Sequence, residues 1–96
     1  MAFQITDTGG VYEIKGLLNS QNYVYLENHL THVLTISRGV VLSLEKVHSI
    51  DKYAVRRMVM LQNKIQPTQK MFFIIGRKNK KVSKQFSQLQ LEEILL

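Results

Sequence analysis

The spacing of apolar and polar residues along the chain predicts alternating strands and helices. Segments 3–6 and 11–14 alternate apolar and polar side chains, as strands with one buried face do. Gly9 and Gly10 lie between them and supply the positive φ that a tight turn requires, so the pattern predicts an N-terminal β-hairpin. A polar loop over 16–21 is expected to follow.

Three later segments carry apolar residues at three- and four-residue spacing, which is typical of amphipathic helices. The first predicts a helix over 23–38, ending near Gly39. The second predicts a helix over 54–65, which must end by Pro67 because proline cannot continue it. The third predicts a shorter helix over 82–89.

Two uninterrupted apolar runs, 40–44 and 71–75, indicate strands covered on both faces. A loop over 45–51 is expected after the first run, and Gly76 stops the second. Strand, helix and strand in this succession predict a βαβ unit with parallel strands. Segment 91–96 is expected to form a last turn or a short strand. The predicted fold is therefore α/β, with a four- to five-stranded mixed sheet, the hairpin, the crossover and three main helices.

Length and composition indicate one intracellular domain. A chain of 96 residues with 45% apolar and 21% charged residues is typical of a single globular domain, here 1–96. The absence of cysteine excludes disulfides, thiol nucleophiles and thiolate metal sites, and it fits a reducing compartment. No apolar run is long enough to cross a bilayer, and the first ten residues do not resemble a signal peptide. We expect a cytoplasmic protein.

The net charge of +6 is concentrated in the second half of the chain. Residues 46–91 hold eleven Lys or Arg against Asp51 alone, a balance of +10. This asymmetry favours an acidic protein partner, a nucleic acid or an anionic surface, although solvated lysines are common on protein surfaces. The densest cluster is a candidate anion-binding surface and comprises Arg77, Lys78, Lys80, Lys81 and Lys84.

Aromatic residues near this cluster argue against base recognition. Phe72, Phe73 and Phe86 all lie in apolar patterns that place them in the core, so none is expected to stack on a base. The sequence also lacks a phosphate-binding loop with the Walker spacing. A nucleic-acid partner is therefore the less favoured alternative.

The order of three segments resembles the STAS domain, the family of bacterial anti-sigma-factor antagonists that is also appended to sulfate transporters. These segments are Gly-Leu-Leu-Asn at 16–19, Val-Val-Leu-Ser-Leu-Glu-Lys-Val-His-Ser-Ile-Asp at 40–51, and the late strand that ends at Gly76. The resemblance covers nearly the whole chain. Its most specific part is the strand at 40–44 followed by 47–50 and Asp51 in register.

The chain departs from the family at the regulatory serine, which follows the matching aspartate by two positions. Tyr53 occupies that position, with Lys52 before it and Ala54 after it where the family has serine and glycine. A serine kinase has no hydroxyl to modify there, so the usual serine-phosphorylation switch is expected to be absent. Ser49 and Tyr53 are the remaining candidates for modification. Asn19 replaces an aspartate and keeps an oxygen that can cap a helix.

The resemblance implies that the loop over 47–52 and the helix after it bind a protein partner. Helical rotation places Arg56, Arg57 and Met60 opposite the core stripe, a combination that is favoured at interfaces and is also compatible with a merely soluble helix. Asp51 is expected to cap this helix and not to act as a general base. The candidate partner-binding residues are Val47, His48, Ser49, Asp51, Lys52, Tyr53, Arg56, Arg57 and Met60.

No set of residues predicts catalysis or a bound metal. Asp51 has no nucleophile or second acid in a fixed sequence relation to it. His29, His32 and His48 have no carboxylate spaced to complete a metal site. We therefore predict a regulatory protein-binding domain that is not an enzyme and has no metal or cofactor. The expected partner is an anti-sigma factor of the serine-kinase type, another signalling subunit or a transporter subunit. The alternatives are a basic nucleic-acid or anionic-surface binder and an accessory STAS subunit of a transporter.

Overall fold

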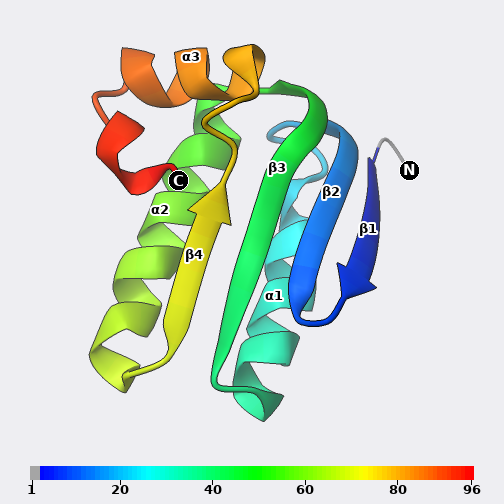
Figure 1. Cartoon of the computed structure of the whole chain (residues 1–96), viewed down its shortest axis with the longest axis vertical. Coiled ribbons are helices and arrows are strands. Elements are labelled where there is room, and N and C mark those ends of the chain that lie inside the picture. The colour runs from blue at the N-terminus through cyan, green and yellow to red at the C-terminus, as the bar shows by residue number, and fades with distance from the viewer. Residues whose placement is uncertain (1–2) are drawn as a thin grey trace.

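Four strands form one mixed sheet, and three α-helices cover one face and one end of it (Figure 1). The computed structural model describes residues 3–96, so the first two residues of the predicted domain lie outside the described part. The elements are β1 (Phe3–Thr8), β2 (Val11–Leu18), α1 (Tyr23–Ile36), β3 (Gly39–Ile50), α2 (Lys52–Ile65), β4 (Met71–Ile75), α3 (Lys80–Gln88) and two 3-10 turns, η1 (Gln66–Thr68) and η2 (Glu92–Ile94).

The strands lie side by side in chain order, β1-β2-β3-β4. The hairpin β1–β2 is antiparallel, while β3 pairs in parallel with β2 and with β4, so the predicted hairpin and βαβ unit are confirmed. The chain end forms the turn η2 and then a single parallel bridge from Leu95 to Ile74. The sheet therefore has four strands, and one bridge takes the place of a fifth.

The main core lies between the sheet and the two crossover helices α1 and α2, which Figure 1 shows on the same side of the sheet. Right-handed crossovers that advance in one direction across a sheet place their helices on one face. The other face therefore has no helix over it. Alternate residues of β4 are accordingly exposed, with Met71 at 56% and Phe73 at 43%.

Two predictions about this region are wrong for that reason. The run 71–75 was expected to be covered on both faces, but β4 alternates between buried and exposed residues. In the run 40–44, by contrast, four residues are buried and Val41 is partly buried, which agrees with the prediction for that strand. Phe73 was expected in the core beside Phe72 and Phe86, which are buried, yet it lies on the uncovered face. An apolar run thus marks the strand correctly without showing which of its faces is covered.

Strand β3 is longer than the pattern predicts, because it continues through the expected loop at 45–51 as far as Ile50. Its pairing with β2 shifts register twice, between Glu13 and Lys15 and between Gly16 and Leu17. Such bulges break the two-residue alternation that identifies a strand in a sequence. The predicted loop at 16–21 likewise begins only after β2 ends at Leu18.

Short connections link the helices to the strands that follow them. At the lower end α1 stops at Ile36, and Gly39 begins β3. A Cβ at Gly39 would lie 2.7 Å from the Met71 carbonyl oxygen, so this position requires glycine where β3 and β4 meet. Helix α2 ends at Ile65, ahead of Pro67, as predicted.

None of the helices within residues 3–96 has the length and apolar character needed to cross a membrane.

Candidate partner-binding surface

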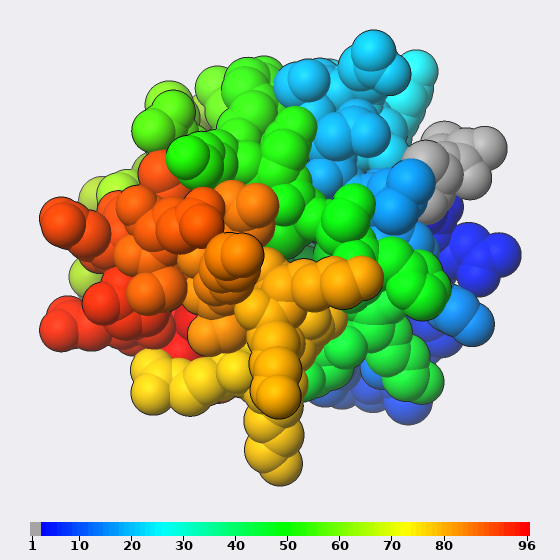
Figure 2. Space-filling view, turned by 90° about the horizontal axis from the view of Figure 1, so that it is seen from above, coloured from blue at the N-terminus to red at the C-terminus, as the bar shows by residue number. Residues whose placement is uncertain are grey.

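The candidate site lies at the carboxyl end of the parallel strands. The β2–α1 loop, the junction of β3 with α2 and the start of α3 meet there, and Figure 2 shows them together in blue, green and orange. In parallel sheets, segments that leave the carboxyl ends of strands gather at one edge. The structure therefore brings the predicted loop at 47–52 and the predicted basic cluster to the same end of the molecule.

Asp51 joins two of these segments through its carboxylate. Its Oδ1 accepts a hydrogen bond from the Ala54 amide at 2.9 Å, which caps α2 as predicted. Its Oδ2 accepts from the Ser20 amide in the β2–α1 loop, also at 2.9 Å. The Asp51 amide in turn donates to the Leu18 carbonyl at 3.1 Å. The carboxylate is thus fully used in fixing the loop against the start of α2, which agrees with a structural role.

Two asparagines order the β2–α1 loop. Asn19 Oδ1 accepts hydrogen bonds from the amides of Gln21 and Asn22, which precede α1. It therefore orders the turn and does not cap the helix, whose N-cap residue, Asn22, makes no side-chain capping bond. Asn22 is buried; its Oδ1 accepts from the Asn19 amide, and its Nδ2 donates to the Leu17 carbonyl. These four bonds hold the loop in place through its own side chains.

Most of the predicted partner-binding residues are accessible at this end. His48, Ser49, Lys52, Tyr53, Arg56 and Met60 are exposed, and Asp51 and Arg57 are partly exposed. Val47 is different, because its side chain is only 3% exposed and belongs to the core. It cannot contribute a side-chain contact to the surface. Its backbone carbonyl instead accepts a hydrogen bond from Asn79 Nδ2 at 2.8 Å.

Arg56 and Arg57 differ in their surroundings, although both are on α2. Arg57 Nη2 donates to Glu27 Oε2 of α1 at 2.8 Å, and this hydrogen bond and ion pair raise the pKa of Arg57. Arg56 forms no ion pair within residues 3–96. Its charge is therefore available to a partner, whereas that of Arg57 is largely neutralised.

A shallow hollow of about 300 Å³ lies between α1 and α2 beside this ion pair. The exposed Met60 and the Lys64 side chain line it together with Glu27, Thr31, Arg57 and Leu61. Beneath it, the Tyr23 hydroxyl is buried and has no hydrogen-bond partner among the described residues. Burial, reinforced by the nearby Glu27 carboxylate, raises the pKa of Tyr23 well above its ordinary value.

Asn79 fixes the basic cluster at the site, and the sequence interpretation missed it. Its Oδ1 accepts hydrogen bonds from the Lys81 and Val82 amides and so caps α3. Its Nδ2 lies within bonding distance of the carbonyls of Leu44, Glu45 and Val47 at 2.8–3.1 Å. An asparagine just ahead of a helical pattern was a usable capping signal, but nothing local indicated its contacts with β3.

The five residues of the cluster, Arg77, Lys78, Lys80, Lys81 and Lys84, are all exposed. They precede α3 or lie on it, at the end of the sheet that also carries residues 48–53 (Figure 2). We call residues 48–53, which comprise the end of β3, Asp51 and the start of α2, the 48–53 loop. This arrangement produces a positive field over one end of the molecule, which favours an acidic partner.

The described residues contain no arrangement suited to metal binding. No group of three or more His, Asp or Glu side chains within residues 3–96 could hold an ion. His29 packs edge-on against Tyr12, with ring centroids 5.8 Å apart.

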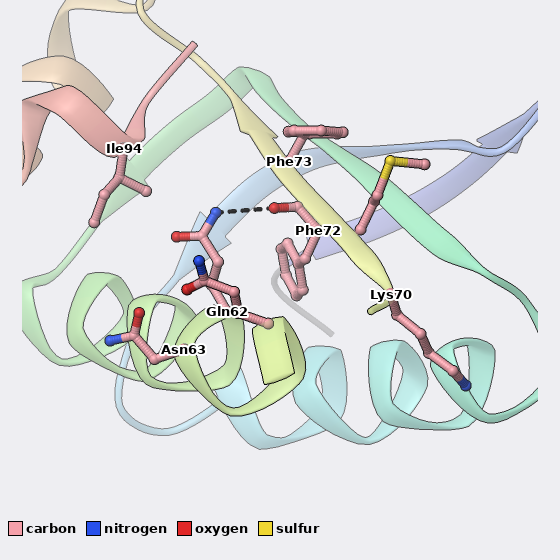
Figure 3. A pocket seen from close by; sticks show the side chains of 8 residues that line it. Gln62, Asn63, Lys70, Phe72, Phe73 and Ile94 are labelled. Carbon is pink, nitrogen blue, oxygen red and sulfur yellow. Dashed lines mark hydrogen bonds between the residues drawn. The ribbon is translucent and has the colours of Figure 1, made fainter. Parts of the chain in front are cut away.

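A hollow of about 450 Å³ beside β4 is larger than the one between the helices (Figure 3). Gln62 Nε2 donates there to the Phe72 carbonyl at 2.9 Å, and the one ionisable side chain that lines it, Lys70, donates to the Leu34 carbonyl. General acid–base catalysis needs one group that donates a proton and another that accepts one. A single lysine that already donates to a carbonyl oxygen does not supply both.

Comparison with known proteins identifies the fold. No protein-family model matches the sequence, and no curated protein matches it by sequence. Among solved structures, the unphosphorylated anti-sigma factor antagonist SpoIIAA is 15% identical, with a TM-score of 0.73 over 99% of this chain and 86% of that chain. An anti-sigma factor antagonist from Mycobacterium paratuberculosis is 16% identical, with a TM-score of 0.78 over 97% and 80%.

The phosphorylated form of the Bacillus cell fate determinant SpoIIAA is 13% identical, with a TM-score of 0.68 over 99% of this chain and 89% of that chain. At these identities the similarity shows the fold alone. The chain therefore has the STAS-like α/β fold that its sequence motifs indicated.

Proposed function

We propose that this protein is a non-enzymatic regulatory domain that binds a protein partner through the 48–53 loop and the exposed side of α2. The observation that carries this proposal is the junction at Asp51, which fixes two loops at one end of the sheet. A surface that is ordered before binding loses little conformational entropy when a partner docks. The similarity to solved anti-sigma factor antagonists supports a role of this kind.

The charge of this end indicates the chemistry of the partner. Lys52, within the 48–53 loop, and Arg56, one turn further along α2, are both exposed, and the basic cluster lies at the same end. An acidic protein surface would complement them and would be steered toward this end. We propose an anti-sigma factor of the serine-kinase type or another signalling subunit as the partner. The role would then be bacterial transcriptional signalling in the cytoplasm.

Regulation at this site would not follow the usual serine switch. The position that corresponds to the family's serine is Tyr53, whose side chain is exposed in the first turn of α2. We propose that Tyr53 acts as a contact residue, since tyrosine provides a large contact area at low entropic cost. In that case binding depends on the ring and does not require the hydroxyl.

The test begins with affinity capture from the native extract and continues with titration of the purified partner by calorimetry. Arg56→Glu is the informative variant, because Arg56 forms no ion pair in residues 3–96 and its reversal leaves the Arg57–Glu27 pair intact. We expect the variant to raise Kd by about tenfold or more, since like charges then face each other across the interface.

Two comparisons separate this surface from a general effect of charge. Lys15→Glu reverses an exposed charge on β2, outside the proposed surface, and should leave Kd unchanged. Tyr53→Phe should also bind normally, whereas Tyr53→Ala should bind more weakly. A partner that binds wild type and Arg56→Glu equally would refute the proposed surface.

A further inference from the structure

The face of the sheet that carries no helix has an apolar strip along β4. Met71, Phe73 and Ile75 alternate with buried residues along this strand, and Figure 3 shows the Phe73 and Phe72 side chains on opposite sides of it. Val41 of β3 is paired with Phe73 and lies on the same face. Leu96, which is 55% exposed, extends the strip beyond Ile75. We call Val41, Met71, Phe73, Ile75 and Leu96 the open-face strip.

Hollows border the open-face strip at both ends. One of about 190 Å³ is lined by Met71, Phe73 and Val41 together with Gly10, Arg38, Gly39 and Val40. Another of about 490 Å³ is lined by Ile75 and Leu96 with Glu45, Arg77 and Lys78. A strip of exposed apolar side chains between hollows can pack against the projecting side chains of another protein chain.

The charges around the strip are mostly positive. Arg38 lines one hollow, and Arg77 and Lys78 line the other. The Arg77 guanidinium donates only to the carbonyls of Leu95 and Glu92, so no carboxylate neutralises it. Glu45 is the one acidic side chain that lines either hollow.

Neither of the two ion pairs within residues 3–96 includes Arg38, Arg77 or Lys78. They join Lys46 to Glu13 and Arg57 to Glu27. The two ends of the strip therefore retain three unpaired cations against one carboxylate, a balance that complements an acidic chain.

We propose that the open-face strip is a second docking surface, which takes an acidic segment with apolar side chains from a partner protein. The apolar side chains would cover Met71, Phe73 and Leu96, and the acidic groups would meet Arg38, Arg77 and Lys78. This surface shares Arg77 and Lys78 with the basic cluster, but its apolar residues lie on β3, β4 and the chain end and not on α2, so the domain would join two protein chains. The inference does not depend on the identity of either.

The observations favour a protein segment over the other occupants of such a face. A second copy of the chain would bring the same cations into contact and carries a net charge of +6. Single-stranded nucleic acid is usually held by several stacking aromatics, whereas Phe73 is the only aromatic in the strip.

The test uses NMR chemical-shift mapping with defined probes on the isotope-labelled chain. The main probe is a synthetic peptide in which Glu alternates with Leu, and a matched peptide carries Lys in place of Glu. We expect saturable shifts at the amides of residues 71–77 with the Glu peptide and none with the Lys peptide. The double variant Met71→Thr with Phe73→Thr removes two apolar side chains, introduces β-branched residues that suit a strand, and should weaken binding about tenfold or more.

The controls separate this inference from the function proposed above. Arg56→Glu should bind the Glu peptide as wild type does, while Arg77→Gln with Lys78→Gln should bind it more weakly. Absent shifts, or shifts confined to residues 48–60, would overturn the proposal even if the first surface were intact. Stronger binding to an oligothymidylate or to phosphatidylserine vesicles, or shifts caused by raising the protein's own concentration, would also overturn it by identifying another occupant.

Discussion

Removing the Asp51 carboxylate should lower the free energy of unfolding, because the carboxylate accepts two backbone hydrogen bonds that would be lost. The bond to the Ala54 amide is a helix cap, which contributes about 1 kcal/mol. The bond to the Ser20 amide also involves a carboxylate, but it is exposed to solvent, so we assign it about 1 kcal/mol. Asp51→Ala should therefore lower the free energy of unfolding by about 2 kcal/mol, and Asp51→Asn, which keeps a capping oxygen, by about half of that.

Urea denaturation followed by circular dichroism measures both variants. The midpoint should fall while the slope stays constant, since neither change alters the surface exposed on unfolding. For a chain of 96 residues a loss of about 2 kcal/mol lowers Tm by about 10 °C. Hydrogen exchange at the Ser20 amide should accelerate in both variants, because both lose the acceptor for that donor.

Two results would refute this reasoning. An Asp51→Ala midpoint equal to that of wild type would mean that water replaces both bonds without loss. An Asp51→Asn midpoint equal to that of wild type would mean that the link to the β2–α1 loop contributes nothing beyond the cap. In either case the junction would not order the surface proposed to bind a partner.

Three further substitutions test other parts of the structure. Asn79→Asp keeps the oxygen that caps α3, but it loses the donor to β3 and places a negative charge against the β3 carbonyls. The free energy of unfolding, measured by urea denaturation, should therefore fall by about 2 kcal/mol. Tyr23→Phe removes a buried hydroxyl that has no hydrogen-bond partner within residues 3–96 and should not destabilise the protein. Because burial raises the pKa of Tyr23 on folding, its contribution to stability is complete below about pH 10 and is lost as the pH rises above that value. In pH-dependent melts the variant should therefore lose less stability than wild type above about pH 10. Gly39→Ala brings a Cβ against the Met71 carbonyl and should lower the free energy of unfolding by about 1–3 kcal/mol in the same urea assay. A midpoint equal to that of wild type would show that β3 and β4 can move apart there without cost.

The two proposed surfaces would give the domain an arrangement suited to regulation. The 48–53 loop lies at the carboxyl end of the strands, whereas the open-face strip runs along β4. Arg77 and Lys78 lie where the strip approaches the basic end of α3. A partner on one surface could therefore change the electrostatic potential at the other, an effect that added salt would weaken.

The placement of most elements could be predicted because each rests on local patterns. Helices α1 and α2 follow apolar residues at helical spacing, and Pro67 limits α2. The hairpin depends on Gly9 and Gly10, whose φ angles are both positive. Asp51 as a helix cap was predictable too, since the cap and the amide it accepts from lie three residues apart.

What only the tertiary structure decided involves residues far apart in the chain. Asn79 bonds to β3 across more than thirty residues, and Ser20 meets Asp51 across a similar separation. The length of β3 depends on bulges in its pairing with β2, and the exposure of Phe73 depends on both crossover helices lying on one side of the sheet. The sequence by itself determined the elements, because propensity and periodicity act within a few residues. The structure decided which faces stay open, because strand order and crossover handedness are properties of the assembled sheet.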